Sequence, residues 1–230
     1  MNLCARLGWS AVALVAITVW PIAAFAHDVA QGDRAFVQAT HGPAIIPFMY
    51  LGAKHMVTGY DHILFLLGVV MFLYRLRDII IFVSMFTLGH SLTLLLGVLF
   101  GTGANSHVVD AIIGLSIIYK GCENLGAFRK LGVAIDPRLM VLVFGLCHGL
   151  GLATKLLSLA ISPDGLIINL LSFNVGVELG QILVLFFIVC LLNLWRARPD
   201  FAKSATLANW MLIGCGTFIM IDQTREYLAA

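Results

Sequence analysis

The chain has 230 residues, of which 60% are hydrophobic and only 11% are charged. Soluble domains carry roughly 25% charged residues, so this composition excludes a soluble globular domain and indicates a polytopic membrane protein. The formal net charge of +2 says little by itself, and the positions of the basic residues are more informative.

The first 26 residues are typical of a secretory signal peptide. Arg6 supplies a positive start, the apolar stretch WSAVALVAITVW follows, and AFA before His27 resembles a cleavage site with small residues. The alternative is an uncleaved first helix, but the polar stretch HDVAQGDR comes directly after the cleavage-like site. We therefore predict a signal peptide over 1–26 and an exported N-terminal segment over 27–46.

Residues 47–223 are predicted to form an all-α membrane domain of six transmembrane helices. The apolar runs do not alternate in polarity as the strands of a membrane barrel do. A spanning helix needs about 20 apolar residues, and each run comes close to this length. The predicted spans are 47–74, 79–101, 108–126, 138–160, 166–195 and 205–223.

The basic residues fall in alternate connections between these spans. The second and fourth connections, TGANS and SPDG, contain neither lysine nor arginine. The first, third and fifth connections contain Arg75, Arg77, Arg129, Lys130, Arg138, Arg196, Arg198 and Lys203. Basic loops stay in the cytoplasm, so we predict a multi-pass protein of the bacterial inner membrane. An even number of spans then places the mature N-terminus and the C-terminus on the outside, in the periplasm.

Ionisable side chains recur near the middle of four predicted spans. In hydrocarbon such a side chain is costly unless it is paired or faces water. Several helices of one bundle can direct such side chains to a common centre. The candidate metal-binding residues are His55, Asp61 and His62 in the first span, His90 in the second, His148 in the fourth and Glu178 in the fifth.

Polar neighbours accompany these candidates. Asn174 and Gln181 lie four and three residues from Glu178, so the three side chains are predicted to form one stripe along the fifth span. Ser91 directly follows His90. His55 and His62 are seven residues apart and are predicted to share one face of the first span.

Imidazole and carboxylate groups together suit a divalent transition metal. This ligand set favours Zn²⁺, Ni²⁺, Co²⁺, Fe²⁺ or Mn²⁺ over Cu(I), which prefers sulfur ligands. A divalent cation also offsets the cost of burying Asp61 and Glu178 as anions. The hypothesis is a ladder of sites from His55 through Asp61 and His62 to Glu178. For any single position, a hydrogen bond between helices is the alternative interpretation.

At these residues the sequence resembles the HupE/UreJ family, the hydrogenase and urease accessory proteins regarded as nickel permeases. The resemblance covers about residues 45 to 222, and Met56 stands where the best-described branch has a proline, so the chain is more similar to a second branch. The resemblance implies a metal permease whose first helix handles the metal through its histidines and aspartate. The motifs that carry it are HMVTGYDH (55–62), FTLGHSLTL (86–94), FGLCHGLGLA (144–153) and FNVGVELGQ (173–181).

We therefore predict a permease, not an enzyme, with a divalent metal ion as its substrate: nickel or cobalt, with zinc as a further candidate. The alternative is an intramembrane metal-dependent enzyme of the hydrolase type with the same metal ligands, for which Ser91 is the nearest candidate nucleophile. A third hypothesis is an accessory or sensor protein that does not transport. The expected partners are the metal ion, the lipid bilayer, a second copy of the chain and metalloenzyme maturation proteins, with no nucleic acid.

Overall fold

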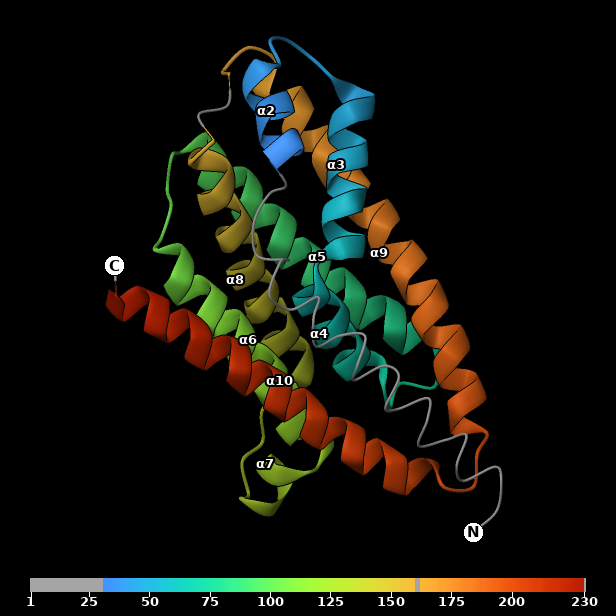
Figure 1. Ribbon diagram of the computed structural model, residues 1–230. Helices are drawn as coiled ribbons and strands as arrows, with labels where there is room; N and C mark the ends of the chain where they lie inside the picture. Colours follow the sequence, from blue (N-terminus) through green and yellow to red (C-terminus); the bar gives the residue numbers. More distant parts are fainter. Residues whose placement is uncertain (1–30, 160–161, 230) are drawn as a thin grey trace.

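The computed structural model describes residues 31–159 and 162–229, which form a bundle of helices (Figure 1). The predicted signal peptide lies outside the described residues. No strand occurs in the part of the chain that the structure describes, which agrees with the predicted all-α class. The helices are α2 (Gln31–Ala39), α3 (Ile45–Thr58), α4 (Tyr60–Val70), α5 (Leu76–Leu99), α6 (Ser106–Asn124), α7 (Ala127–Lys130), α8 (Pro137–Leu157), α9 (Leu166–Arg196) and α10 (Phe201–Ala229).

Four helices are long and apolar enough to cross a membrane: α5, α8, α9 and α10. They correspond to the second, fourth, fifth and sixth predicted spans, so the chain is a multi-pass membrane protein by the length and composition of its helices. The third predicted span corresponds to α6, which carries Asp110, Lys120 and Glu123 within its 19 residues. The count of six spans stays a prediction.

The first predicted span is broken into two helices, and the prediction of one continuous helix is wrong. Gly59 separates α3 from α4 and is extended, with φ −72° and ψ 94°. Its N–H still donates to the His55 carbonyl at 2.9 Å, so the break keeps this hydrogen bond. A Cβ at Gly59 would lie 2.8 Å from His62 Nδ1 and 3.1 Å from Asp61 Oδ1. The close approach of these two side chains therefore requires glycine.

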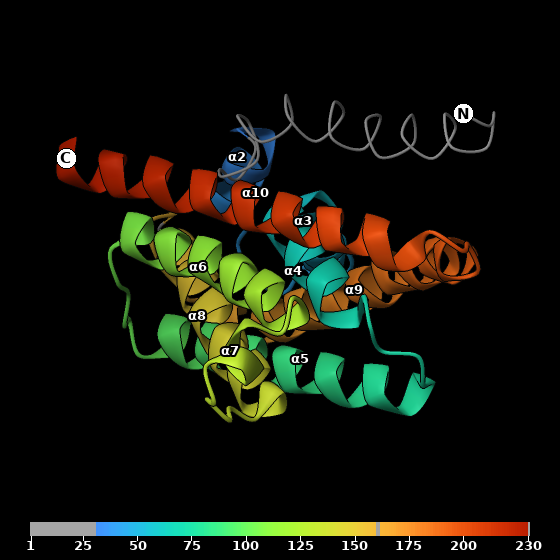
Figure 2. The same cartoon turned by 90° about the horizontal axis from the view of Figure 1, so that it is seen from below.

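The other long helices pack in three pairs: α3 with α9, α5 with α8, and α6 with α10. Glycines let the backbones touch in each pair. An added Cβ would meet the Phe173 carbonyl at Gly52 and the His90 carbonyl at Gly149, and at Gly114 it would lie 2.8 Å from a carbonyl oxygen of α10. The short helix α4 contacts α5, α6, α9 and α10, so it lies between the pairs (Figure 2).

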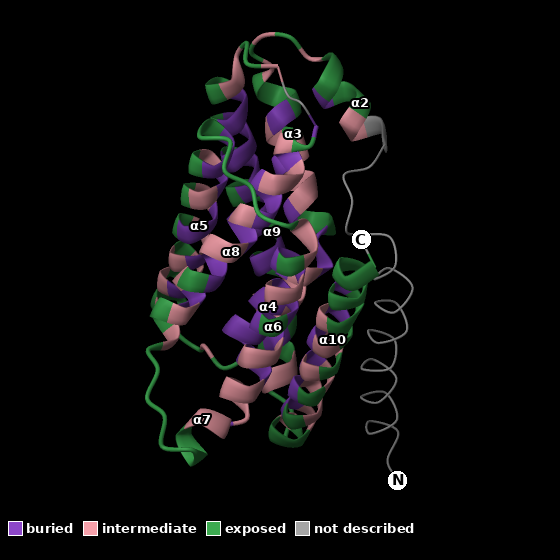
Figure 3. Ribbon diagram, turned by 90° about the vertical axis from the view of Figure 1, so that its left-hand side faces the viewer, coloured by how far each residue is buried: buried purple, intermediate pink, exposed green. Residues whose placement is uncertain are grey.

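Buried side chains fill the middle of the bundle, while many exposed side chains on its outside are apolar (Figure 3). Phe65 and Leu66 of α4 are fully buried, whereas Phe186, Phe187 and Trp210 are exposed on α9 and α10. Exposed aromatic and aliphatic side chains in such number are typical of a surface that faces lipid rather than water. The exterior therefore supports a position in the bilayer.

The connections rich in arginine and lysine lie at one end of the bundle, which we call the basic end. Helices α4, α6 and α9 end there, and α5, α8 and α10 begin there (Figure 1). Arg196, the last residue of α9, donates to the carbonyls of Val70 at 2.6 Å and Met71 at 2.9 Å. The last carbonyls of a helix have no partner within it, so Arg196 caps α4 and attaches it to α9.

Candidate metal centre

Four histidines from four helices meet beside the break at Gly59. His55 comes from the last turn of α3, His62 from the first turn of α4, and His90 and His148 from the central parts of α5 and α8. The centroid of the His62 ring lies 5.0 Å from His55, 5.9 Å from His90 and 5.1 Å from His148. The structure therefore brings these four predicted residues together in the interior.

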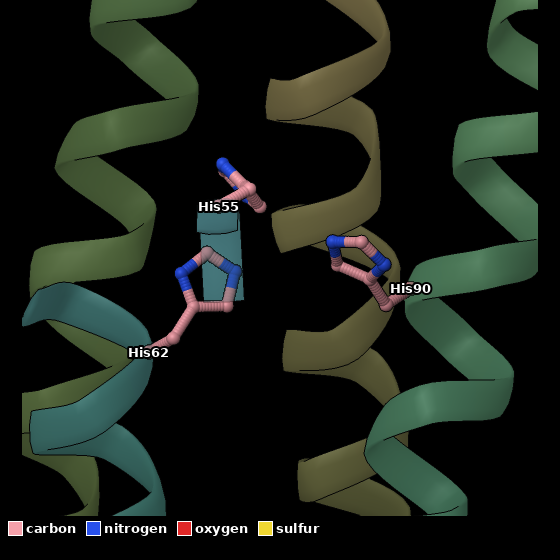
Figure 4. A group of neighbouring side chains, drawn as sticks. All are labelled: His55, His62 and His90. Atoms are coloured by element: carbon pink, nitrogen blue, oxygen red, sulfur yellow. The ribbon is translucent and has the colours of Figure 1, made fainter. Parts of the chain in front are cut away.

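Three of the histidines offer nitrogens to one point. One ring nitrogen each of His55, His62 and His90 lies within 4.8 Å of the other two. Figure 4 shows the three side chains reaching toward a shared space from different helices. Imidazole nitrogens bind Zn²⁺ at about 2.0–2.1 Å, which corresponds to nitrogens roughly 3.3 Å apart in a tetrahedral site. A small inward movement of the rings would thus enclose an ion.

Hydrogen bonds orient two of the rings. His62 Nδ1 lies 3.0 Å from Asp61 Oδ1, and His148 Nδ1 lies 2.7 Å from the Phe144 carbonyl oxygen. A carbonyl oxygen and an oxygen of an ionised carboxylate can only accept, so beside ionised Asp61 and the Phe144 carbonyl each Nδ1 carries a proton and donates it. In a neutral imidazole the other nitrogen, Nε2, then holds a free lone pair. His62 and His148 can therefore bind a ligand through Nε2. Metal-binding histidines commonly donate their other ring N–H to a carboxylate or carbonyl oxygen in this way.

Ring nitrogens in the cluster lack partners. Among the described residues, the buried atoms without a hydrogen bond include Nε2 of His55, His62 and His148 and both nitrogens of His90. A buried polar atom left unpaired costs about 1–3 kcal/mol. Such atoms are scattered and few in most proteins, whereas here they gather at one place. A ligand that accepts several lone pairs at once, such as a metal ion, fits this arrangement.

Asp61 and Glu178, the two predicted acidic ligands, differ in position. Asp61 lies at the cluster, where one oxygen already accepts the His62 proton, and its side chain is 20% exposed. Glu178 is exposed on α9, and the structure does not bring it to the cluster. The buried face of α9 carries Asn174, Val177 and Gln181. Glu178 directly follows Val177, and successive residues of a helix are rotated by about 100°, so Glu178 lies off that face.

The three predicted supporting residues are buried or half-buried between the helices. Asn174 donates to the Leu170 carbonyl at 3.2 Å, and Gln181 accepts a hydrogen bond of 3.0 Å from Thr87 on α5. In the described part of the chain, Asn174 Oδ1, Gln181 Nε2 and Ser91 Oγ have no hydrogen-bond partner. Unpaired polar atoms are therefore also present on α5 and α9, the first of which carries His90.

Three phenylalanines close the cluster on the side of the basic end, and we call them the phenylalanine floor. Phe65, Phe86 and Phe144 each lie one helical turn from a histidine of the cluster, on α4, α5 and α8. The Phe65 ring lies 5.3 Å from Phe86 and 5.9 Å from Phe144, and none of the three is more than 6% exposed. The layer was not predicted from the sequence, although each phenylalanine stands three or four residues from a histidine.

The family comparison agrees with the resemblance seen in the motifs. A family model described as HupE / UreJ protein matches residues 31–229, which is nearly the whole chain. No curated protein and no solved structure matches the chain. The four histidines and Asp61 all fall within the matched residues. The chain belongs to the HupE/UreJ family.

Proposed function

We propose that the protein is a permease whose substrate is a divalent transition-metal cation, with nickel or cobalt as the first candidates and zinc as a further one. The observation that carries this proposal is the group of unpartnered imidazole nitrogens in one buried cluster. Membership of a family associated with nickel or cobalt transport or with accessory function supports it. The long apolar helices supply a bilayer-spanning scaffold.

In this proposal His55, His62, His90 and His148 bind the ion, and Asp61 positions His62. Imidazole is a borderline ligand that suits Ni²⁺, Co²⁺ and Zn²⁺. The negative charge of Asp61 offsets part of the charge of a divalent ion, and neutral imidazoles offset none. A site that is only partly neutralised holds an ion without trapping it, as a transport site requires.

The break at Gly59 favours a transport site over a site that retains its ion permanently. Irregular backbone at membrane depth occurs where it is buried in protein or lines a cavity, and transporters place their ion sites at such broken helices. The ion would reach the cluster from the end opposite the basic end and leave when the phenylalanine floor opens. Because basic loops stay in the cytoplasm, this direction is uptake, followed by delivery to metalloenzyme maturation proteins.

The proposal is tested with purified protein in lipid vesicles. We expect radioactive Ni²⁺ or Co²⁺ to enter vesicles that contain the protein, and the variants His62→Ala and His148→Ala to lower the initial rate by about tenfold or more. His41→Ala is the matched control, since His41 is an exposed histidine outside the cluster. Equal rates in all variants would contradict the proposal. Hydrolysis of lipid or peptide without metal flux would favour the enzyme alternative.

A further inference from the structure

A cavity at the basic end lies between α6, α7 and α10, away from the histidines. It has a volume of about 380 Å³. Its wall is formed by the connection after α4, the end of α6, the last residue of α7 and the first part of α10 (Figure 1). The lining contains one basic residue and no acidic residue. The lining residues are Phe72, Asn124, Leu125, Lys130, Thr206, Asn209 and Trp210.

Lys130 gives this cavity a positive charge that no carboxylate neutralises. It is exposed at the end of α7, and its ammonium group pairs with no acidic side chain in the described part of the chain. Glu123 pairs with Lys120 at 3.0 Å and does not line the cavity. Asp136 is engaged as the N-cap of α8. The charge of the cavity therefore favours an anionic ligand.

The inner wall of the cavity is polar and fixed by hydrogen bonds. Asn209 is fully buried, and Asn124 Nδ2 donates to Asn209 Oδ1 and to the Gly68 carbonyl, both at 2.9 Å. Asn209 in turn donates to the Ala205 carbonyl at 2.8 Å. Among the described residues, Asn124 Oδ1 accepts no hydrogen bond, so it can accept one from a ligand. A ligand that is only hydrocarbon would leave this wall unsatisfied.

The outer wall of the cavity is apolar and faces the outside of the bundle. Trp210 is 60% exposed and Phe72 is 39% exposed. Thr206 is exposed one helical turn before Trp210, so the two side chains share one face of α10. Tryptophan is enriched where membrane meets water, because its ring contacts acyl chains while its N–H donates to polar groups. The cavity thus joins a cation, a polar wall and an apolar wall.

We propose that this cavity binds the headgroup of an anionic phospholipid, with the phosphate at Lys130 and the Trp210 N–H and with the acyl chains along Trp210 and Phe72. An amphiphile fits better than a free anion, because the apolar wall adjoins the charged and polar groups. Basic pockets between membrane helices on the cytoplasmic side bind lipid headgroups, and the positive-inside rule places the basic end on that side. The bound lipid would join the connection after α4 to α6 and α10.

Native mass spectrometry of the purified full chain in neutral detergent with added lipid tests the site. We expect the wild type to bind one phosphatidylglycerol about fivefold more tightly than phosphatidylcholine, and Lys130→Gln to lose this preference, because one lysine beside an anionic lipid contributes about this factor. Lys203→Gln is the matched control, since Lys203 is exposed at the same end of α10 but does not line the cavity. No preference in the wild type, or an equal loss in both lysine variants, would overturn the inference.

Thermal unfolding gives a second measurement, because a ligand that binds the folded state raises the unfolding temperature. Phosphatidylglycerol should stabilise the wild type but not Lys130→Gln/Trp210→Leu, whose two changes replace exposed side chains and leave the unfolding temperature without lipid nearly unchanged. Inorganic phosphate at the same concentration should have no effect. Equal stabilisation by inorganic phosphate, or lipid stabilisation that persists in the double variant, would refute a lipid site here. Neither measurement uses a metal ion, so the result does not depend on the proposed function.

Discussion

At the scale of single residues, the contact between Asp61 and His62 determines which ring nitrogen of His62 is free to accept a ligand. The carboxylate accepts the Nδ1 proton at 3.0 Å, so His62 offers Nε2 to the shared space. His148 reaches the same state by donating to the Phe144 carbonyl. Protein groups that hold a metal-binding histidine in this way raise metal affinity by about 10–100-fold. Asp61 thus acts through His62.

Asp61→Asn tests this role. The amide keeps the shape of the side chain but removes the charge and permits the wrong tautomer of His62, so we expect affinity for Ni²⁺ or Co²⁺ to fall by about 10–100-fold. Equilibrium binding to the purified protein measures it. Asp222→Asn is the control, since Asp222 is exposed near the end of α10. Equal affinity in the two variants would mean that Asp61 does not position His62.

Glu178→Gln tests whether Glu178 is a metal ligand, as the sequence predicted, or lies away from the site, as the structure places it. Because Glu178 is exposed on α9, away from the histidines, we expect vesicle flux to stay within about twofold of the wild type. Loss of flux comparable to that of His62→Ala would return Glu178 to the ion pathway. The measurement is the initial rate of metal entry at equal protein content.

At the scale of helices, backbone contact through glycine holds the site together. Gly149 of α8 lies against the His90 carbonyl and Thr93 of α5, so the two helices that carry His90 and His148 touch at the level of the cluster. Thr93 also donates to the Leu146 carbonyl of α8 at 2.7 Å. The distance between His90 and His148 is therefore set by a position with no side chain.

Gly149→Ala should push these helices apart. Overpacking of this kind costs about 1–3 kcal/mol, so we expect a lower thermal unfolding temperature together with weaker metal binding. Gly214→Ala is the matched control on α10, where an added Cβ meets nothing within 4 Å. Alanine is favoured over glycine in a helix by about 1 kcal/mol, so this control should be neutral or stabilising. A Gly149→Ala protein as stable as the Gly214→Ala protein would contradict the packing described here.

The sequence predicted most helix positions because long apolar runs with few charges leave little choice in a membrane. It did not predict the break at Gly59, since an isolated glycine inside an apolar run is compatible with a continuous helix. It grouped the histidines correctly because each is costly in lipid, but the same argument included Glu178. The free-energy cost of a charged side chain in lipid does not indicate which face of α9 that residue occupies. The phenylalanine floor was missed because phenylalanine in an apolar run is ordinary packing.

At the scale of the whole molecule, three helix pairs surround the short helix α4, and the basic connections share one end. The histidines lie between that end and the opposite one, and the phenylalanine floor and Lys120 lie between the histidines and the basic end. From the opposite end toward the basic end, the order of layers is thus imidazole and then phenyl ring. In the permease that we propose, this order gives the cation path a direction, and the positive-inside rule relates the basic end to the cytoplasm.

Cysteine labelling in intact cells tests this orientation. Thr102→Cys lies in the connection opposite the basic end, and Leu131→Cys lies in the basic-end connection, where Leu131 is 74% exposed. In a background without the native cysteines, we expect a membrane-impermeant maleimide to label the first variant from outside and the second only after permeabilisation. The reverse pattern would place the basic end outside and reverse the proposed direction of transport.

X-ray absorption spectroscopy of the purified protein loaded with Ni²⁺ or Co²⁺ counts the imidazole ligands around the ion and so tests the histidine centre. We expect a nitrogen-dominated shell with several imidazoles, and the loss of one imidazole in His62→Ala, with no change in His41→Ala. A bound ion surrounded only by oxygen ligands, or an imidazole count unaffected by His62→Ala, would contradict it.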